Sequence, residues 1–244
     1  MINKKFIYEN VITIIYAIII AVFIRTLFIQ PFYIPSSSME PNLLVGDRLF
    51  VSKYSYGYSR HSFPFSPNFT SSRYFKKIPK RGDVVVFKTP ADNRTDYIKR
   101  LIGLPGDKIQ IIDGEIFLND KKIQRKKIQT NKTINCGERK MEAIIFRETF
   151  DNEKKYVAVY SAHGSMANTD VYLVPDEHFF FMGDNRDCSK DSRYLGSVGY
   201  VHFNNIVGKA QIIFFSNDKK RGSLFKFWNW DQILRMERFL MKIE

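Results

Sequence analysis

KIQIIDGEIFL, residues 108–118, places two short runs rich in isoleucine on either side of an Asp113-Gly114 pair. An Asp-Gly pair suits the two-residue turns in which both backbone φ angles are positive, and such turns join antiparallel strands. The β-branched and aromatic residues on each side favour extended backbone. The stretch therefore predicts a β-hairpin.

Similar short runs recur on both sides of this hairpin along the chain. They are β-branched or aromatic and bounded by turn-forming residues, and they comprise 48–51, 83–87, 156–160, 179–182 and 209–215. The sequence shows no alternation of strands with helices and no long internal repeat, so a parallel βαβ fold is not expected. We predict a mainly β domain with a partly closed sheet.

An apolar segment lies before the predicted strands. Residues 11–24 read VITIIYAIIIAVFI, and apolar residues resume at 27–29 after Arg25 and Thr26. A helix of about nineteen residues spans roughly 28 Å, close to the thickness of a hydrocarbon core. A cleaved signal peptide fits less well because no small-x-small site follows, and a buried core helix is the other alternative. We predict a retained transmembrane anchor over 10–29.

The charges that flank this anchor predict its orientation. The N-terminal amine and two lysines supply positive charge before it, against a single glutamate. The positive-inside rule then places residues 1–9 in the cytoplasm. Residues 30–244 form an extracytoplasmic domain, since long domains cross a membrane largely regardless of their charge.

The chain is strongly basic. Its 244 residues include 38 Lys and Arg against 25 Asp and Glu, which gives a net charge of +13. Such a charge suits nucleic acid or anionic lipid as a partner. We favour lipid, because the charge is spread along the chain and accompanies an apolar segment, and no zinc finger, RNP-type motif or long basic block is present.

Metal chemistry has little support in the sequence. The two cysteines, Cys136 and Cys188, form no CxxC pair, and the four histidines show no HExxH spacing. No metal site and no cofactor are therefore expected. The sequence does not fix the redox state of the cysteines; we take them as unpaired, and a disulfide between them stays open.

Two stretches differ from the predicted strands. Residues 54–80 hold many aromatic rings among Ser, Pro, Gly, Lys and Arg. These rings either cover the edges of the core or rest among lipid headgroups, where aromatic and basic side chains are both favoured. Residues 225–243 carry apolar residues at spacings of three and four, which predicts an amphipathic helix that packs on the domain or lies on the bilayer.

Ser38 and Lys99 are the candidate catalytic residues. Ser38 lies in IPSSSMEP, residues 34–41, soon after the anchor. A serine needs a base to become a nucleophile, and none of the histidines lies in a convincing arrangement for that role. Lysine can serve when burial lowers its pKa by several units. Lys99 lies among the apolar residues of 97–102, so we predict a serine nucleophile with a lysine base.

Further groups near these two residues fit the same chemistry. Attack on a carbonyl needs donors for the developing oxyanion, and the Ser36 hydroxyl and the Ser38 amide can face one side of an extended segment. Pro35 and Pro41 stiffen that segment. Residues 182–194, MGDNRDCSKDSRY, predict a rigid turn whose hydroxyls orient the lysine amine.

At these residues the chain resembles the bacterial type I signal peptidases of peptidase family S26. These are membrane-bound serine proteases that remove signal peptides from exported preproteins. Four blocks in the family's order carry the resemblance, namely 34–47, 81–87, 96–107 and 183–193. Ser37 stands where the family frequently has glycine, and Cys188 where it frequently has a small polar residue, but neither difference removes a functional group.

The resemblance implies a β-rich, signal-peptidase-like catalytic domain in a single-pass protein of the bacterial cytoplasmic membrane. It implies that Ser38 is the nucleophile and Lys99 the general base. It also implies supporting roles for the oxyanion hydroxyl of Ser36, a hydrogen bond to the lysine amine from Ser189, and an ion pair between Asp191 and Arg193.

The resemblance also implies how substrate binds. Family members take up the peptide as an added strand, with shallow pockets for small residues at the first and third positions before the cut. The matching positions here are Phe32, Ile34, Pro35, Leu49, Val86, Asp96, Tyr97 and Ile98. Main-chain bonds then provide affinity, and the pockets admit only alanine-sized groups. The implied partners are secretory preproteins and the phospholipid bilayer, without nucleic acid.

Other classes of protein remain as alternatives. A self-cleaving repressor-type Ser/Lys peptidase accounts for neither the anchor nor the Gly-Asp-Asn-Arg block. A penicillin-binding enzyme would use the SxxK string at 216–219, which has no companion motifs. A membrane-bound adaptor that grips peptides would have no need of the candidate catalytic residues, and a nucleic-acid binder is suggested by charge alone.

Overall fold

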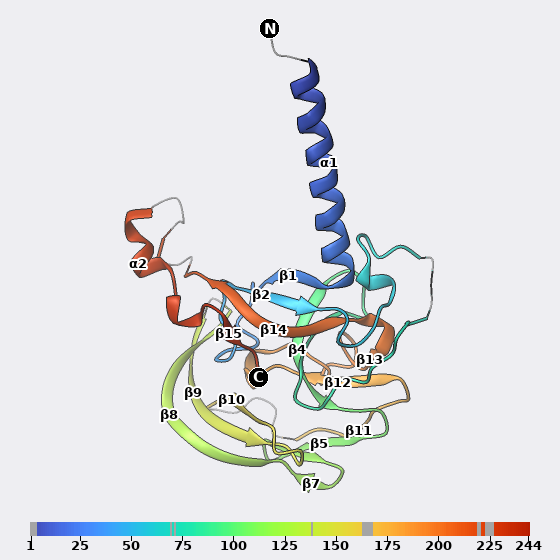
Figure 1. The fold of residues 1–244 in the computed structure, drawn as a ribbon. Coiled ribbons are helices and arrows are strands. Elements are labelled where there is room, and N and C mark those ends of the chain that lie inside the picture. Colours follow the sequence, from blue (N-terminus) through green and yellow to red (C-terminus); the bar gives the residue numbers. More distant parts are fainter. Residues whose placement is uncertain are drawn as a thin grey trace.

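A long helix stands on a β-rich body in the computed structural model of this chain (Figure 1). The structure describes residues 4–68, 70, 72–137, 139–162, 168–218, 221–222 and 227–244. The mainly β domain and the N-terminal apolar helix predicted from the sequence are both confirmed.

Helix α1 runs from Lys4 to Leu27 and is the one helix among the described residues that is long and apolar enough to cross a membrane. At 1.5 Å per residue it extends about 36 Å, somewhat more than a hydrocarbon core of roughly 30 Å. Its side chains are exposed almost throughout, which excludes the alternative of a buried core helix. The predicted end at residue 29 was wrong, because Ile29 already belongs to a strand that pairs with Ser52.

The largest sheet is antiparallel throughout and carries the candidate catalytic segments. Its strands follow the order β1 (Ile29–Tyr33), β2 (Asp47–Ser52), β14 (Ile206–Ser216), β3 (Val84–Lys88), β4 (Asp96–Gly103), β12 (His178–Met182) and β13 (Val201–His202), and β15 (Met241–Lys242) also pairs with β14. Because β1 continues directly from α1, the end of the helix is fixed to one edge of this sheet.

Two smaller sheets complete the β structure. One contains β11 (Tyr172–Leu173), β5 (Lys108–Ile112), β6 (Glu115–Leu118) and β7 (Lys121–Lys122), and the other contains β10 (Lys155–Ser161), β9 (Arg139–Thr149) and β8 (Gln124–Cys136). The hairpin predicted over 108–118 is confirmed as β5 and β6, with Ile112 opposite Glu115. Asp113 and Gly114 both have positive φ, 49° and 71°, as this turn requires.

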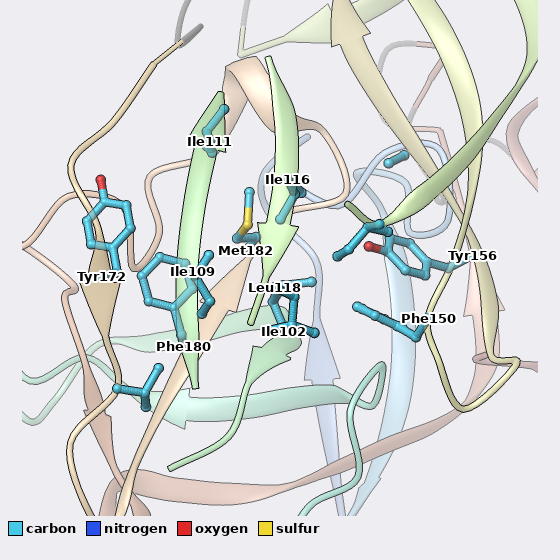
Figure 2. Close-up of a cluster of buried hydrophobic side chains, with 13 residues drawn as sticks. Ile102, Ile109, Ile111, Ile116, Leu118, Phe150, Tyr156, Tyr172, Phe180 and Met182 are labelled. Atoms are coloured by element: carbon cyan, nitrogen blue, oxygen red, sulfur yellow. The ribbon is translucent and has the colours of Figure 1, made fainter. Parts of the chain in front are cut away.

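Two strands of the largest sheet are buried on both faces. In β3, Val84 and Val86 pack into one apolar cluster, whereas Val85 and Phe87 pack into another. Successive side chains of a strand point to opposite faces, so β3 needs apolar residues at every position. The same holds for β12, where Phe180 and Met182 join the cluster between the three sheets shown in Figure 2. This double burial explains the unbroken apolar runs in the sequence.

Short helical turns occupy several connections. They are the 3-10 turns η1 (Arg60–Ser62), η2 (Arg186–Cys188), η3 (Phe203–Asn205), η4 (Phe227–Asn229) and η5 (Met236–Arg238), together with the single α-helical turn α2 (Trp230–Ile233). Turn η2 matters most for the site, because it follows β12 and lies within the predicted rigid turn of 182–194.

The continuous amphipathic helix predicted for residues 225–243 is not formed. Residues 225 and 226 lie outside the described residues, and from 227 onward the chain forms only α2, η4, η5 and β15. The Arg235 amide donates to the Ser216 carbonyl at 3.1 Å, and Arg238 forms a buried ion pair with Asp47 at 2.6 Å. The first bond satisfies a main-chain donor that a helix would otherwise pair, and the ion pair holds the segment against the sheet.

The aromatic residues of 54–80 are divided between the core and the surface. Tyr56 is buried and its hydroxyl donates to Asp83 at 2.9 Å. By contrast, Tyr54, Phe65 and Phe75 are exposed, and Phe69 lies outside the described residues. Tyr56 therefore belongs to the core, whereas contact of the exposed rings with lipid headgroups stays a prediction.

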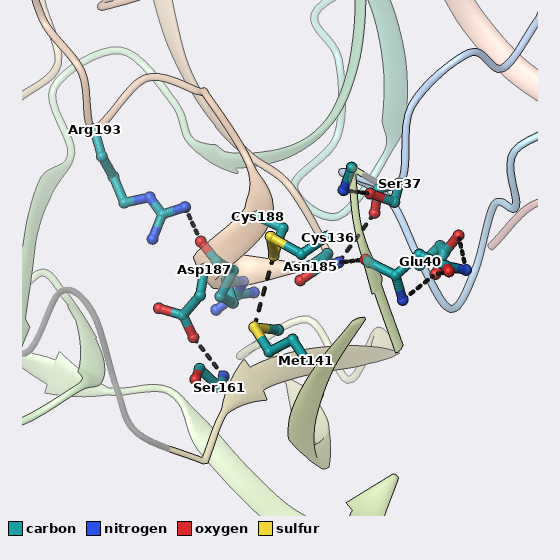
Figure 3. Close-up of a disulfide and its surroundings, with 12 residues drawn as sticks. Ser37, Glu40, Cys136, Met141, Ser161, Asn185, Asp187, Cys188 and Arg193 are labelled. Atoms are coloured by element: carbon teal, nitrogen blue, oxygen red, sulfur yellow. Dashed lines mark hydrogen bonds between the residues drawn. A yellow bond between two sulfur atoms is a disulfide. The ribbon is translucent and has the colours of Figure 1, made fainter. Parts of the chain in front are cut away.

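Cys136 and Cys188 form a disulfide with an S–S distance of 1.99 Å (Figure 3). Our interpretation of the cysteines as unpaired was therefore wrong. The bond joins the end of β8 to η2, across a sequence separation of 52 residues. Spacing could not predict it, because strand β8 is mostly polar and basic and gives no clear apolar signal that would place Cys136 beside the turn.

We predict that replacing both cysteines with serine lowers the free energy of unfolding by about 2–4 kcal/mol, because the disulfide restricts the unfolded chain. The measurement is the thermal unfolding midpoint of the full chain in detergent under non-reducing conditions. Reduced wild-type protein is the control and is expected to match the double variant. If the double variant and the reduced wild type both unfold at the same midpoint as the oxidised wild type, the bond contributes nothing to stability.

Candidate active site

The segment that carries Ser38 is held by the core beneath it. Met39 and Leu43, which flank the turn after Ser38, are fully buried in the apolar cluster of β2, β3 and β14. The Glu40 amide donates to the Ser37 carbonyl at 3.0 Å, and the Leu43 amide donates to the Met39 carbonyl at 2.9 Å. Ser38 itself is 6% exposed. Two buried anchors and a closed turn therefore fix the position of the hydroxyl.

Lys99 approaches the same hydroxyl from the middle of β4. Its Nζ atom lies 2.6 Å from Ser38 Oγ, within hydrogen-bonding distance. It also lies 5.3 Å from the centroid of the Tyr97 ring and donates to the Ile98 carbonyl at 3.1 Å. The predicted meeting of Ser38 and Lys99, 61 residues apart, is therefore present in the structure.

Burial controls the charge of this amine. The side chain of Lys99 is almost fully enclosed, with 3% of the residue exposed. Burial lowers the pKa of Lys99 to about 8, and the carboxylates of Asp191 and Asp184 oppose part of that shift. Desolvation disfavours the charged form of a lysine, so about a tenth of the amine is neutral at pH 7 and about half at pH 8. The neutral amine has a lone pair that can accept the proton of Ser38.

Ser36 lies at the open side of the pair. Its hydroxyl oxygen is 3.3 Å from Ser38 Oγ, and the residue is exposed whereas Ser38 is buried. A donor in this position can reach an oxygen that develops next to Ser38 during attack.

The turn after β12 closes the other side of the site. The Asn185 amide donates to the Ser38 carbonyl at 3.1 Å, and its side-chain amide donates to the Ser37 carbonyl at 3.2 Å. Gly183 donates its amide to Asp191 at 2.9 Å. The nucleophile segment is therefore tied to this turn by main-chain bonds as well as by packing.

Three predicted supporting residues lie within this turn. Asp191 and Arg193 form a buried ion pair at 2.8 Å. Burial raises the pKa of Asp191, but the charge of Arg193 and the hydrogen bonds to the carboxylate together bring that pKa below its ordinary value. Ser189 is buried beside them. Among the described residues, its hydroxyl makes no hydrogen bond of normal geometry, so the predicted bond from Ser189 to the Lys99 amine is absent in this conformation.

Several positioning residues were missed by the sequence analysis. The Arg100 guanidinium binds both carboxylate oxygens of Asp184, at 2.7 and 2.8 Å, and both side chains are fully buried. Asn42 donates to the same carboxylate at 2.7 Å. Asp184 therefore connects the strand of Lys99 with the segment of Ser38. The only sequence signal was that these residues fall within the quoted blocks.

A second buried ion pair supports η2. Arg186 and Glu148 lie 2.7 Å apart with both side chains 2% exposed. The hydroxyls of Tyr156 and Tyr160 each donate to Glu148 at 2.5 Å. Since every member has a partner, this group can hold the turn rigid in a buried setting. Glu148 and the tyrosines come from β9 and β10, and neither strand falls within the sequence blocks that predicted the site.

A cleft of about 530 Å³ opens beside Ser38 and Lys99. Seven of the eight predicted substrate-binding residues line it, namely Phe32, Ile34, Pro35, Val86, Asp96, Tyr97 and Ile98. Leu49 does not, because it is fully buried beneath the cleft. Tyr33, Thr95, Cys188 and Lys190 line the cleft as well, and the sequence analysis did not assign these to substrate binding.

The walls of the cleft include unpaired strand edges. β12 pairs with β4 only from Arg100 onward, so residues 96–98 have no described strand on that side. β1 pairs with β2 along one edge only. Strand edges of this kind can accept an extended peptide as a further strand. Among the described residues, no group of three or more His, Cys, Asp or Glu side chains could hold a metal ion.

Comparisons with known proteins place the chain in one sequence family. The family model described as "Signal peptidase, peptidase S26" matches residues 7–215. The chain is 42% identical to a signal peptidase I of Rickettsia typhi over 239 residues, covering 94% of this chain and 85% of the relative. It is 45% identical to a signal peptidase I of Rickettsia akari over 211 residues, covering 82% of this chain and 77% of the relative.

Among solved structures, the crystal structure of a signal peptidase I from Enterococcus faecalis is similar to this chain at 25% sequence identity. The match covers 55% of this chain and 97% of the other, with a TM-score of 0.33.

We predict that Gly183→Ala disrupts the site. A Cβ atom at Gly183 would lie 2.5 Å from the Ser38 carbonyl oxygen and 2.2 Å from Ser189 Oγ, so the nucleophile segment must move. The expected result is a loss of about 1–3 kcal/mol in stability and a fall in cleavage rate.

Gly196→Ala is the matched control, because a Cβ atom there meets nothing within 4 Å. Thermal unfolding and peptide cleavage are measured on both variants in detergent. Equal behaviour of the two variants would show that the close approach at Gly183 is not required.

Proposed function

The chain belongs to the signal peptidase S26 family, and from that premise we propose that Ser38 is its nucleophile and Lys99 its general base. The protein is a signal peptidase I, a serine peptidase that removes signal peptides from preproteins. The observation that carries the proposed roles is the 2.6 Å distance between Lys99 Nζ and Ser38 Oγ in a buried setting.

The reaction begins with proton transfer between these two groups. The neutral Lys99 amine takes the proton of Ser38 as Oγ attacks the carbonyl carbon of the scissile peptide bond. The tetrahedral intermediate collapses when the Lys99 ammonium gives that proton to the departing amine, which leaves an ester on Ser38. Lys99, neutral again, then takes a proton from water as the water attacks the ester carbon. The Lys99 ammonium returns this proton to Ser38 Oγ as the acyl–Oγ bond breaks, which releases the signal peptide with its new carboxyl end.

The negative oxygen of the intermediate needs donors that are already in place. We assign this role to the Ser36 hydroxyl and the Ser38 amide. The 3.3 Å separation of the Ser36 and Ser38 hydroxyl oxygens supports the assignment, because the negative oxygen of a substrate carbon bonded to Ser38 Oγ would lie within reach of Ser36. Donors fixed in a partly buried site stabilise such charge more than water does.

Ser189, Asp191 and Arg193 act as positioning residues in this proposal. The ion pair of Asp191 and Arg193 fixes the turn, and Ser189 is buried next to it. We propose that the Ser189 hydroxyl bonds to the Lys99 amine when substrate fills the cleft. Ser189 Oγ makes no hydrogen bond of normal geometry among the described residues, and its weaker interaction with Asp191 keeps the hydroxyl on the side of the turn from which this bond would form.

The preprotein is proposed to bind as an extended strand between β1 and residues 96–98. Unpaired edges on both sides of the cleft support this mode. Apolar side chains, including Ile34, Val86 and Ile98, line the cleft and leave shallow space suited to small residues before the cut. A substrate with small residues at the first and third positions before the cut is therefore expected.

We further propose that α1 crosses the bacterial cytoplasmic membrane with residues 1–9 in the cytoplasm and the domain of 30–244 outside. The exposed apolar helix and the basic N-terminal flank support this orientation. The exposed rings of Tyr54, Phe65 and Phe75 suit contact with lipid headgroups, so the bilayer is proposed as a partner of the segment 54–80.

We predict that Ser38→Ala abolishes cleavage and that Lys99→Met lowers its rate by roughly 10²–10⁴-fold, the usual contribution of a general base. Lysine is a base only when neutral, so kcat/KM should rise with pH through the lowered pKa of about 8 and level off above it. The assay is cleavage of a purified preprotein with an Ala-x-Ala signal end in detergent across pH 6–10.

The control for this experiment is Lys190→Met, which removes another lysine that lines the cleft. It should retain the pH profile of the wild type. Normal cleavage by Ser38→Ala would point to another nucleophile, and preprotein binding without any cleavage by the wild type would support the adaptor alternative.

We predict that Ser36→Ala lowers kcat by roughly 10²–10³-fold, the typical effect of removing one oxyanion donor. KM should change little, because the bond forms mainly in the transition state. Ser36→Thr keeps the hydroxyl and should restore most of the rate. Equal loss in both variants would indicate a steric role for Ser36 instead.

A further inference from the structure

Two cavities adjoin where α1 meets the β domain. One of about 580 Å³ lies between the end of α1 and the loops after β2 and β3, and the other, of about 540 Å³, runs along the side of α1. Phe63 and Pro64 line both cavities. The Tyr58 hydroxyl donates to the Leu27 carbonyl at 2.7 Å, which fixes the segment that contains Tyr58, Phe63 and Pro64 against the helix end. Figure 1 shows this segment, in cyan, beside the lower end of α1.

The first cavity is strongly cationic. Its lining contains the basic side chains of Arg25, Lys53, Arg60, Lys88 and Arg94, against two carboxylates. One of those carboxylates, Asp96, is already paired with Lys88 at 2.9 Å. The other, Asp92, accepts bonds from the main chain of Arg94 and Thr95. No described carboxylate forms an ion pair with Arg25, Lys53 or Arg60, so the cavity carries uncompensated positive charge.

Lys53 shows that this positive charge is built into the fold. The residue is 2% exposed, and its amine donates to the Ser62 carbonyl at 2.5 Å. Burial, and next the positive charge of Arg25, lower the pKa of Lys53 to about 8. A buried amine among like charges is costly unless an anion joins it. The geometry therefore favours a negatively charged group in this cavity.

The second cavity is apolar and follows the helix. Its lining runs from Ile18 to Leu27 on α1, with Phe63 and Pro64 opposite. The nine steps of helix between these two residues rise about 14 Å, close to half the thickness of a hydrocarbon core. Thr26 also lines it, and its buried hydroxyl has no hydrogen-bond partner among the described residues. An acyl chain fits this groove, and the ester group above it can supply an acceptor for Thr26.

We propose that these cavities together bind one anionic phospholipid, with its phosphate in the cationic cavity and an acyl chain along α1. The basic side chains would hold the phosphate, and the groove opens into the hydrocarbon because it lies on the membrane-spanning helix. The excess of positive charge favours a headgroup with net negative charge, such as phosphatidylglycerol, over a zwitterionic one. This inference goes beyond the proposed function and needs from it only that α1 crosses the bilayer.

The position of this lipid site relates it to the cleft. Asp96 lines both the cationic cavity and the cleft beside Ser38, and β1 runs from the helix end to the cleft. A lipid held here would fix the height and tilt of the cleft at the membrane surface. That is the place where the end of a signal peptide leaves the hydrocarbon.

The test is native mass spectrometry of the full chain in detergent, titrated separately with palmitoyl-oleoyl phosphatidylglycerol, the matching phosphatidylcholine and inorganic phosphate. Phosphatidylglycerol should bind as one retained molecule, at least tenfold more tightly than phosphatidylcholine. The double variant Arg60→Gln, Arg94→Gln should weaken its binding by roughly 30-fold. Val22→Trp places a large side chain in the groove. It should weaken the binding of phosphatidylglycerol at least tenfold and leave the binding of inorganic phosphate unchanged.

The charge-matched control is the double variant Lys121→Gln, Lys126→Gln, on β7 and β8 far from α1 (Figure 1), which should bind phosphatidylglycerol like the wild type. Unchanged thermal unfolding midpoints show that the variants are folded, independently of cleavage activity. Equal binding of the two lipids, or equal weakening by the control variant, would overturn the site. Phosphatidylglycerol binding that survives Val22→Trp, with inorganic phosphate bound as tightly as the lipid, would show a free-phosphate site instead.

Discussion

The contact between the buried Lys99 amine and the Ser38 hydroxyl is the interaction on which the chemistry of this protein depends. At 2.6 Å the two groups are placed for proton transfer, but distance alone is not enough, since a solvated lysine would stay charged at neutral pH. The second requirement is a lowered pKa, and the protein meets it by enclosing the amine of this β4 residue under the turn after β12. Position and protonation state therefore have one cause, the packing of these two elements around the side chain.

The fold keeps this packing rigid through buried charges. Arg100 follows Lys99 in β4, and its bidentate ion pair with Asp184 fixes the strand to the turn. Truncating one partner of such a pair leaves an uncompensated buried charge and is strongly destabilising. Asp184 also raises the pKa of Lys99, against the larger effect of burial. The same carboxylate therefore positions the site and limits how far the pKa of the amine falls.

The sequence predicted the parts of this structure that follow from local pattern. The residue types of the Asp113-Gly114 turn and of the run 83–87 are enough to predict a turn and a strand. The family resemblance related Ser38 to Lys99 across 61 residues. What the sequence could not predict depends on contacts between distant segments. The mostly polar strand β8 has no clear apolar signal, so the disulfide at Cys136 was missed. The helix expected near Arg238 failed because an ion pair to Asp47 draws the chain onto the sheet.

The most direct test of this account is the titration of the Lys99 amine itself. In the full chain labelled with ¹³C at lysine Cε, the resonance missing from the Lys99→Met spectrum belongs to this side chain, and its chemical shift reports protonation. The account predicts a midpoint near the lowered pKa of about 8. A midpoint above 10, the ordinary range of a solvated lysine, would contradict it, because the neutral fraction of the base at pH 7 would then fall from about a tenth to below about a thousandth.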